Sequence, residues 1–190
     1  MKKAQLNPQP LIGITPTVLV GTMVNGKPNF MTVAWCGVAN STPAMVSVAI
    51  RPARYTLKGI HDSKEFSVNV PSNSLVKETD YCGIVSGSKQ DKVSVCKFKI
   101  FFGKLKSAPL IEQCPVNLAC VVEHVLELGS HQLIIGRVEE TFINDNCLTE
   151  GKPDIRKIKP FAYAMGGQQA YIALGKSLGK AFSVGQELGK

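Results

Sequence analysis

The residues best suited to chemistry lie in one segment, residues 29–56. It contains the only tryptophan of the chain, Trp35, and two closely spaced arginines, Arg51 and Arg54, followed by the hydroxyl of Thr56. Guanidinium groups and a hydroxyl at a strand end and helix start suit a phosphate group. The alternative for these residues is a core tryptophan with two surface arginines.

No nucleophile in the sequence is paired with a base. The histidines, His61, His124 and His131, lie outside any G-x-S-x-G or H-E-x-x-H motif. No G-x-G-x-x-G is present. Gly175-Lys176-Ser177 resembles the end of a P-loop, but the first glycine of that motif would fall at position 170, where this chain has Ala170. These absences favour a protein whose reaction is performed by a bound redox cofactor.

A flavin mononucleotide (FMN) fits this combination of residues. It needs a flat apolar slot for its ring, backbone donors and acceptors for the polar ring edge, and cations and hydroxyls for its phosphate. Residues 32–36 would present strand-end backbone groups to the ring, while Arg51, Arg54 and Thr56 would meet the phosphate. We therefore predict that residues 29–56 form one wall of a flavin site.

Three strands are predicted in and next to this segment. Residues 17–24 are apolar and β-branched, and Asn25-Gly26 follows them as a strong hairpin signal. Residues 29–35 are predicted as the returning strand and residues 45–50 as a third, with a bend of small residues between them.

Later elements follow from the same signals. Thr56 is a candidate N-cap for a helix over residues 55–63, and Ser72 or Asn73 for a second helix through Tyr81. Further predicted segments are strands at 65–70, 97–102, 116–128, 131–143 and 161–165, loops at 83–87, 109–115 and 153–160, a short helix or turn at 91–93, and a glycine-weakened helix at 171–188. Antiparallel strands joined by hairpins predict a β-barrel, which closes its sheet edges.

Length and composition place limits on the type of protein. With 190 residues and 44% apolar content, we expect one domain, with residues 160–190 as a dimer or lid segment. No apolar run reaches the roughly 20 residues of a membrane span, and polar residues 5–10 interrupt a signal-peptide pattern, so we expect a cytoplasmic protein. Six scattered cysteines without metal-ligand spacing favour buried free thiols over a zinc or iron–sulfur site.

The net charge of +8 opens a second class of function. A non-enzymatic barrel that binds a phosphorylated ligand or nucleic acid would also be basic. The lysines are spread along the chain and no basic stripe with stacking aromatics is visible, so we do not expect nucleic-acid binding.

Several motifs in order resemble the flavin reductase-like domain family, in particular the flavoredoxins. They cover most of the chain. The motifs are Asn29-x-x-Thr32-Val33-Ala34-Trp35, Pro43-x-x-Val46-x-Val48-x-Ile50-Arg51, Tyr55-Thr56 with Ile60, Phe66-x-Val68-Asn69, Cys82-Gly83 to Ser86-Gly87 with Asp91-Lys92, and Gly129-Ser130-His131 before the strand at 133–138.

This resemblance implies a mainly β, antiparallel FMN-binding split β-barrel of Greek-key type, with short flanking helices. It implies a homodimer with its flavin sites near the interface. The residues that it assigns to ring and ribityl chain are Asn29, Thr32, Val33, Ala34, Trp35, Cys36, Ala49, Ile50, Arg51 and Asn69, and those that it assigns to the phosphate are Tyr55, Thr56, Lys92 and His131.

Each transferred role has an alternative. Asn69 would otherwise satisfy a strand end, Lys92 would be a solvated lysine, and His131 a hairpin-edge histidine. Tyr163 and Tyr171 are further candidates for ring or interface neighbours. Many family members carry an acidic residue where this chain has Ser130, which bears on how a nicotinamide would be handled.

The expected function is that of a flavoprotein of flavoredoxin or flavin reductase type. Bound FMN would carry electrons from NADH, NADPH or a redox partner protein to an acceptor. A nicotinamide-dependent flavin or ferric reductase and a pure electron carrier both remain open, and no catalytic side chain or metal is predicted.

Overall fold

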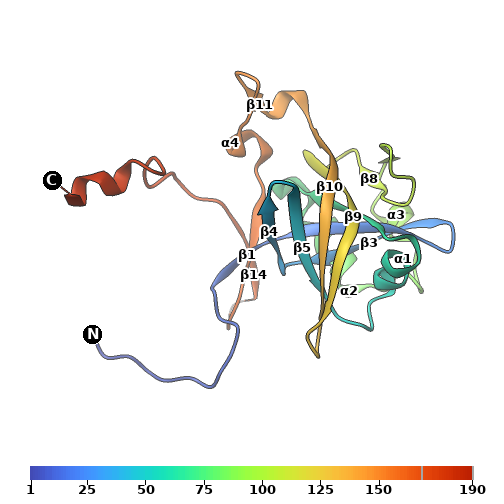
Figure 1. The fold of residues 1–190 in the computed structure, drawn as a ribbon, viewed down its shortest axis with the longest axis horizontal. Helices are drawn as coiled ribbons and strands as arrows, with labels where there is room; N and C mark the ends of the chain where they lie inside the picture. The colour runs from blue at the N-terminus through green and yellow to red at the C-terminus, as the bar shows by residue number, and fades with distance from the viewer. Residues whose placement is uncertain (168, 190) are drawn as a thin grey trace.

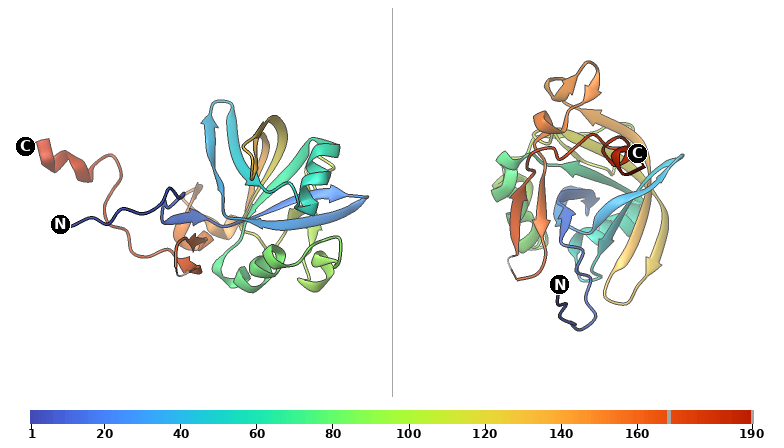
Figure 2. Two further views of the ribbon diagram at one scale, coloured as in Figure 1. Left: turned by 90° about the horizontal axis from the view of Figure 1, so that it is seen from below. Right: turned by 90° about the vertical axis from the view of Figure 1, so that its left-hand side faces the viewer.

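A curled antiparallel sheet is the centre of the computed structural model, which describes residues 1–167 and 169–189 (Figure 1). Its strand order is β3-β2-β6-β9-β10-β5-β4. The strands are β2 (Val18–Val24), β3 (Lys27–Val33), β4 (Cys36–Ser41), β5 (Ala44–Ile50), β6 (Glu65–Val70), β9 (Val116–Glu127) and β10 (Gln132–Ile143). Only Ala34 and Trp35 separate the two edge strands in sequence, so the sheet must curl to bring its edges together, as expected of a barrel (Figure 2).

The first hairpin confirms the prediction from Asn25-Gly26. Both turn residues have positive φ, 51° and 75°, and Val24 pairs with Lys27 across the turn. Two consecutive positive φ angles match the twist of the flanking strands, and Asn and Gly tolerate them best. The long hairpin of β9 and β10 and the strand β6 are also confirmed.

The bend predicted between residues 35 and 45 is wrong, because this segment is strand β4. It pairs with β5 through Cys36↔Val48 to Ser41↔Ala44, with an irregularity between Val38 and Asn40. Most of the β4 residues are exposed, and the strand therefore needs no alternation of apolar and polar residues. Without that alternation the sequence gives no sign of a strand here. Pairing with β5 determines its conformation.

The helices cover the barrel and bring the loops of the site together. α1 (Tyr55–Ser63) has the predicted bounds, but Arg54 occupies the N-cap position, so the predicted Thr56 cap is wrong. η1 (Asn73–Leu75) and α2 (Val76–Ile84) replace the helix predicted to end at Tyr81, and neither has a side-chain cap from Ser72 or Asn73. α3 (Lys92–Val95) begins after Asp91, whose carboxylate accepts hydrogen bonds from the N–H groups of Val93 and Ser94.

A second sheet joins the two ends of the chain. It consists of β1 (Ile14–Pro16), β13 (Phe161–Ala164) and β14 (Ala170–Ala173). The helix predicted over residues 171–188 is wrong: β14 pairs with β13, residues 174–183 belong to no helix or strand, and a 3₁₀ segment, η3, spans Val184–Gly189. The first and last segments leave the barrel on the same side (Figures 1 and 2).

Short elements complete the chain. The strand predicted over residues 97–102 is reduced to β7 (Ile100–Phe101), and the predicted loop at 109–115 contains its partner β8 (Leu110–Ile111). The predicted loop at 153–160 contains a helical turn. The remaining elements are η2 (Asp145–Cys147), β11 (Leu148–Thr149), β12 (Lys152–Pro153) and α4 (Ile155–Ile158).

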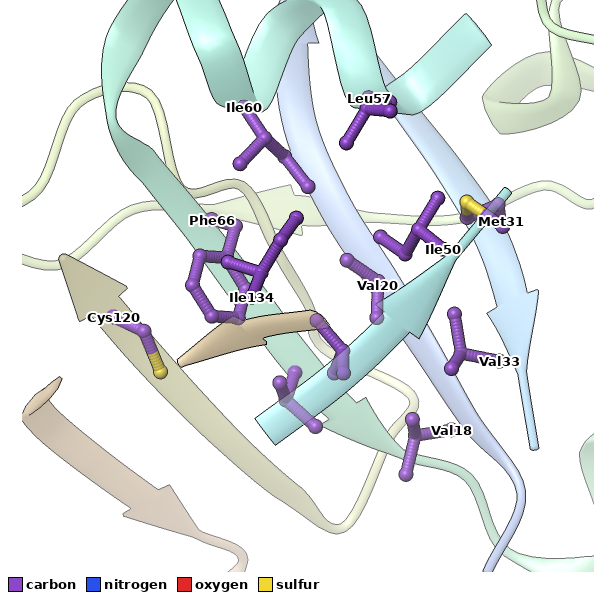
Figure 3. Packing of buried hydrophobic residues seen from close by; sticks show 12 residues of the cluster. Val18, Val20, Met31, Val33, Ile50, Leu57, Ile60, Phe66, Cys120 and Ile134 are labelled. Carbon is purple, nitrogen blue, oxygen red and sulfur yellow. The ribbon is translucent and has the colours of Figure 1, made fainter. Parts of the chain in front are cut away.

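The main core fills the inside of the curled sheet beneath α1 (Figure 3). Phe66 is fully buried, and its ring packs where Gly136 leaves space: a Cβ on Gly136 would lie 2.4 Å from it. Met31 and Ile50 belong to the same core and are almost fully buried. The strand ends that carry these two side chains are therefore held by core packing.

All six cysteines are free thiols, four buried and two half-buried. None of the helices in the described ranges has the length and apolar content needed to cross a bilayer.

Candidate functional site

Three hollows lie in a row along one side of the barrel. The large hollow, of about 460 Å³, and the small hollow, of about 70 Å³, share Met31 and Arg54. The small hollow and the outer hollow, of about 360 Å³, share Tyr55, Gly87 and Lys92. These shared residues make the three hollows neighbours. A long ligand can therefore extend from one into the next.

The large hollow is built from strand ends and from both ends of the chain. Its floor comes from the ends of β3 and β5. Its rim comes from the N-terminal residues 9–11, the residue before β10 and the β13–β14 region. The lining residues are Gln9, Pro10, Leu11, Met31, Thr32, Val33, Ala34, Trp35, Ala49, Ile50, Arg51, Arg54, His131, Tyr163, Met165, Gly166 and Gln169.

Backbone groups are available on this floor. β3 is an edge strand of the seven-stranded sheet, so alternate peptide groups point away from β2. Ala34 and Trp35 lie beyond its last ladder pair, Val18↔Val33, and the carbonyl of Trp35 accepts a hydrogen bond from Ala49 N–H at 2.9 Å. This bond fixes the 34–35 connection, and residues 32–35 line the hollow, so their remaining backbone groups are the candidates for bonding a ligand there.

Two aromatic rings form one side of the large hollow. Trp35 stacks on His131 with ring centroids 4.3 Å apart and an interplanar angle of 28°. Ser130 Oγ lies 2.9 Å from Nδ1 of His131. Burial and the Arg51 guanidinium lower the pKa of His131, which favours a neutral imidazole at pH 7. Trp35 is still 38% exposed, which leaves part of its indole free to contact a ligand.

Positive charge dominates the lining of the large hollow. The guanidinium groups of Arg51 and Arg54 line it beside the neutral His131 ring, and its lining contains no aspartate or glutamate among the described residues. Arg54 Nη1 also donates to the carbonyl of Gly83 at 3.1 Å, which ties the start of α1 to the end of α2. An anionic ligand would supply the missing counter-charge.

The small hollow lies at the N-terminus of α1. No side chain caps this helix within the described residues, and its first turn contains no acidic residue. Thr56, only 1% exposed, lines the hollow, and its Oγ accepts a hydrogen bond from Asn29 Nδ2 at 2.7 Å. A hydroxyl has one proton, so Thr56 can still donate that proton to a ligand.

Lys92 brings a buried ammonium group to the small hollow. It is 4% exposed, and Nζ donates to the carbonyls of Cys82 and Val85 at 3.1 and 3.2 Å. Burial lowers the pKa of Lys92, and the neighbouring Arg54 guanidinium lowers it further. An ammonium has three protons, so one remains after these two bonds. Two cations and no acid in the described lining favour an anion.

Gly87 closes the loop over this end of the site. A Cβ at this position would lie 1.8 Å from Asn29 Oδ1 and 3.2 Å from Cδ1 of Tyr55. Only glycine lets the backbone of the loop approach these two side chains so closely. Gly87 thus forms a common wall of the small and outer hollows.

The structure brings most of the predicted residues together. Those that line the large hollow are Thr32, Val33, Ala34, Trp35, Ala49, Ile50, Arg51 and His131; those at the small or outer hollow are Asn29, Tyr55, Thr56 and Lys92. His131 and Lys92 were expected in one phosphate pocket, but they line different hollows. His131 immediately precedes β10 and stacks on Trp35, whereas Lys92 begins α3 and bonds the carbonyls of Cys82 and Val85 at the end of α2.

Two predicted residues do not line any of these hollows. Asn69 is fully buried in the sheet: its Nδ2 donates to Leu19 O and Ser67 Oγ, and its Oδ1 accepts from Ile111 N and Asn117 Nδ2, at 2.8–3.0 Å. Its observed role is to bond β6 to its neighbours. Cys36 packs its half-buried side chain against the main core, and burial raises its pKa to about 11.

Sequence reasoning missed part of the lining. Residues 9–11 and Met165, Gly166 and Gln169 reach the large hollow because β1 pairs with β13. No local pattern in the sequence indicates that pairing. Tyr163, a candidate neighbour from the sequence, does line the hollow, while Tyr171 pairs with it and donates its hydroxyl to Asp80 Oδ1 at 2.9 Å.

Comparisons with known proteins agree with the fold. A model of the flavin reductase like domain matches residues 14–170. Flavoredoxin from Methanosarcina acetivorans has a TM-score of 0.94 and 37% identity, over 99% of this chain and 100% of that one. Flavoredoxin of Desulfovibrio vulgaris (Miyazaki F) has a TM-score of 0.89 and 34% identity, over 97% and 100%. An uncharacterized protein of Archaeoglobus fulgidus is 35% identical over 68% of this chain and 72% of its own length.

Proposed function

The chain belongs to the flavin reductase-like domain family, and from that premise we propose that it binds FMN across the large and small hollows. Two flavoredoxins share its fold over nearly the whole chain, at 37% and 34% identity. The observation that carries the proposal is that an aromatic, ring-sized hollow adjoins a small cationic one through Met31 and Arg54.

The residues present fit this cofactor. The large hollow has the volume of a small-molecule site, the stacked Trp35 and an open strand edge, which suit a flat ring with one polar edge. The small hollow has the uncapped start of α1, the free proton of Thr56 and the ammonium of Lys92, which suit a phosphate. Arg54 lines both and would meet the chain between ring and phosphate.

FMN, when bound, supplies the redox chemistry by accepting a hydride or single electrons and passing them on. The protein's contribution is binding, orientation and electrostatics. Arg51 and Arg54 place positive charge at the large hollow, which stabilises an anionic ligand and raises its tendency to accept electrons. The Ala49 to Trp35 bond and the core packing of Met31 and Ile50 hold the backbone that would orient the ring.

The visible spectrum of the purified protein tests FMN binding. We expect a yellow protein, or a colourless one that takes up added FMN with quenching of Trp35 emission, since Trp35 is the only tryptophan and lines the hollow. A colourless protein that also fails to bind added FMN refutes the proposal. Replacing Thr56 and Lys92 together by alanine should weaken FMN retention.

The electron donor and acceptor form the finer part of the proposal. We propose transfer from NADH, NADPH or a donor protein through FMN to an acceptor. Anaerobic stopped-flow mixing of the FMN-loaded protein with each nicotinamide separates the two cases. Rapid bleaching by NADH or NADPH identifies a reductase, whereas no bleaching by either identifies an electron carrier.

We further propose that the chain forms a homodimer. Leu178 and Phe182 are fully exposed and Leu188 is 93% exposed in the described residues of the last segment. Apolar side chains of this size favour burial against a second surface, and this segment projects from the barrel on the same side as the N-terminal lead (Figure 1). A sedimentation mass of one chain at micromolar concentration would contradict the dimer.

A further inference from the structure

Helix α2 is bonded to two residues that line the large hollow. The carbonyl of Thr79 accepts a hydrogen bond from Thr32 Oγ1, at the floor of the hollow. The carbonyl of Gly83 accepts one from Arg54 Nη1 at 3.1 Å. α2 is thus fixed to the barrel beside the site, and a side chain of this helix can anchor another part of the wall.

Asp80 and Tyr171 join α2 to the second sheet. Tyr171 Oη donates a hydrogen bond to Asp80 Oδ1 at 2.9 Å, and both side chains are half-buried. Within the described residues, no other side-chain hydrogen bond connects β14 to the rest of the chain. Burial raises the pKa of Tyr171, and the Asp80 carboxylate raises it further, so the phenol keeps the proton that it donates. Because β14 is an edge strand of its sheet, this bond is its anchor on that side.

Tyr171 in turn places Tyr163, which lines the large hollow. The two residues lie directly opposite each other in β13 and β14, so their side chains share one face of the pair. Their ring centroids are 6.2 Å apart at an interplanar angle of 61°. The buried Phe161 meets the Tyr171 ring edge to face, with centroids 5.4 Å apart. The bond to Asp80 therefore acts on the hollow through the ring of Tyr163.

The same bond holds a larger part of the rim. Met165, Gly166 and Gln169, which follow β13, also line the large hollow. On the β13 side this region is fixed by the bond from Met165 N to Gly13 O at 2.8 Å, and on the β14 side by the hydroxyl of Tyr171. The floor of the hollow is held by core packing, so the rim is the part of the wall that can open for a ligand.

We propose that Asp80 and Tyr171 are positioning residues of the flavin site: their hydrogen bond holds Tyr163 and the β13–β14 rim against the bound ring and slows release of the flavin. The inference rests on the FMN site proposed above, because the ring must occupy the large hollow. The bond then favours a flavin that stays with the protein over one that is exchanged at each turnover.

The rate constants of flavin binding test the proposal. Quenching of Trp35 emission is followed after the flavin-free protein is mixed with FMN or with riboflavin at several concentrations. The slope of the observed rate against concentration gives the association rate constant, and the intercept gives the dissociation rate constant.

Tyr171→Phe removes the hydroxyl and keeps the ring. Since a hydrogen bond to a charged group is lost, we expect the dissociation rate constant to rise roughly tenfold for both flavins. The association rate constant should change less than about twofold. Asp80→Ala should have the same effect, and the double variant should exceed neither single variant, because all three lack the same bond. Asp80→Asn keeps an oxygen that accepts the bond and should retain most of the slow release.

Tyr81→Phe is the matched control. It removes a hydroxyl from a half-buried tyrosine of the same helix that lines none of the three hollows, and it should leave both rate constants unchanged. Urea unfolding of each flavin-free variant measures any general loss of stability.

The outcomes separate the inference from the function on which it rests. Faster release in Tyr171→Phe and in Asp80→Ala, with unchanged release in Tyr81→Phe, supports the inference. An unchanged dissociation rate constant in these two variants, even with lower stability to urea, overturns it and leaves the FMN site standing, as does an equal rise in the control. Failure of the unmodified protein to bind either flavin refutes the proposed function and the inference together.

Discussion

Replacing Thr56 by valine separates the phosphate contact from the rest of the flavin site. Valine has nearly the shape of threonine but lacks the hydroxyl. In the structure this hydroxyl accepts from Asn29 Nδ2 at 2.7 Å, which leaves its own proton for a ligand in the small hollow. Thr56→Val should therefore weaken binding of FMN through the loss of one hydrogen bond to its phosphate.

The size of the effect follows from the charge of the acceptor. A hydrogen bond to a charged group contributes about 1.5–3 kcal/mol, which corresponds to a roughly 10- to 150-fold rise in the Kd of FMN. The same change leaves the buried Asn29 amide without its partner and should lower the free energy of unfolding of the flavin-free protein by about 1–3 kcal/mol.

Quenching of Trp35 fluorescence by FMN and by riboflavin measures the two affinities. Riboflavin lacks the phosphate, so its Kd should stay unchanged in Thr56→Val, while Thr56→Ser, which keeps the hydroxyl, should bind FMN like the unmodified protein. Urea unfolding of each flavin-free variant gives its stability. An unchanged FMN affinity in Thr56→Val, or an equal loss for riboflavin, would refute the assignment of the phosphate to the small hollow.

Three further changes test the fold and the assembly. Asn69→Leu should lower the free energy of unfolding by about 3 kcal/mol or more, because Ile111 N and Asn117 Nδ2 lose a buried acceptor. Its affinity for riboflavin at low temperature should stay the same. A weaker affinity for riboflavin in the folded variant would show that Asn69 contacts the ring. Burial raises the pKa of Cys120 from 9.0 to about 12, so above pH 9 the unfolded chain loses a proton that the folded chain keeps, and stability falls by about 1.4 kcal/mol per pH unit. Chemical unfolding between about pH 9 and 10.5 should show a loss of stability per pH unit that is smaller in Cys120→Val than in the unmodified protein by about this amount. Parallel plots of unfolding free energy against pH for the two proteins would contradict the prediction. Deletion of residues 176–190 should shift the protein from dimer to monomer in sedimentation, and an unchanged dimer would place the interface elsewhere.

Much of the fold could be predicted because its signals are local. Asn25-Gly26 specifies a turn whose geometry few other residue pairs accept. Residues 65–70 alternate apolar and polar side chains, which predicts a strand, although the structure buries both faces of it. β4 escaped prediction because Gly37, Asn40 and Ser41 carry no strand pattern, and hydrogen bonding to β5 imposes its conformation.

The prediction of a C-terminal helix was wrong for a related reason. The sequence predicted a glycine-weakened helix over residues 171–188, but Tyr171 lies opposite Tyr163 in the β13–β14 pair and its hydroxyl donates to Asp80. The hairpin pairing and the bond to the sequence-distant Asp80 together outweigh a helix that contains Gly175, Gly179 and Gly185.

The candidate site could be predicted only along one wall. Residues 29–56 carry the arginines and the indole in one continuous stretch, so spacing alone brought them together. The opposite wall comes from residues 9–11 and from the β13–β14 region, which only tertiary pairing brings to the same place. Asn69 shows the converse limit, since a buried asparagine that bonds four neighbours has no sequence feature that separates it from one that contacts a ligand.

The open edge of β3 bears on the solubility of the protein. An edge strand has hydrogen-bonding groups without a ladder partner, to which a strand of another molecule can add, the first step of many aggregates. Helices α2 and α3 already pack against β3, so the part of the edge that concerns aggregation is its end at residues 32–35. A planar ligand seated against Thr32 to Trp35 would mask that edge, and the lead at residues 9–11 shields it from the other side of the hollow. Protein produced in cells short of riboflavin should therefore precipitate more readily than protein produced with an ample supply.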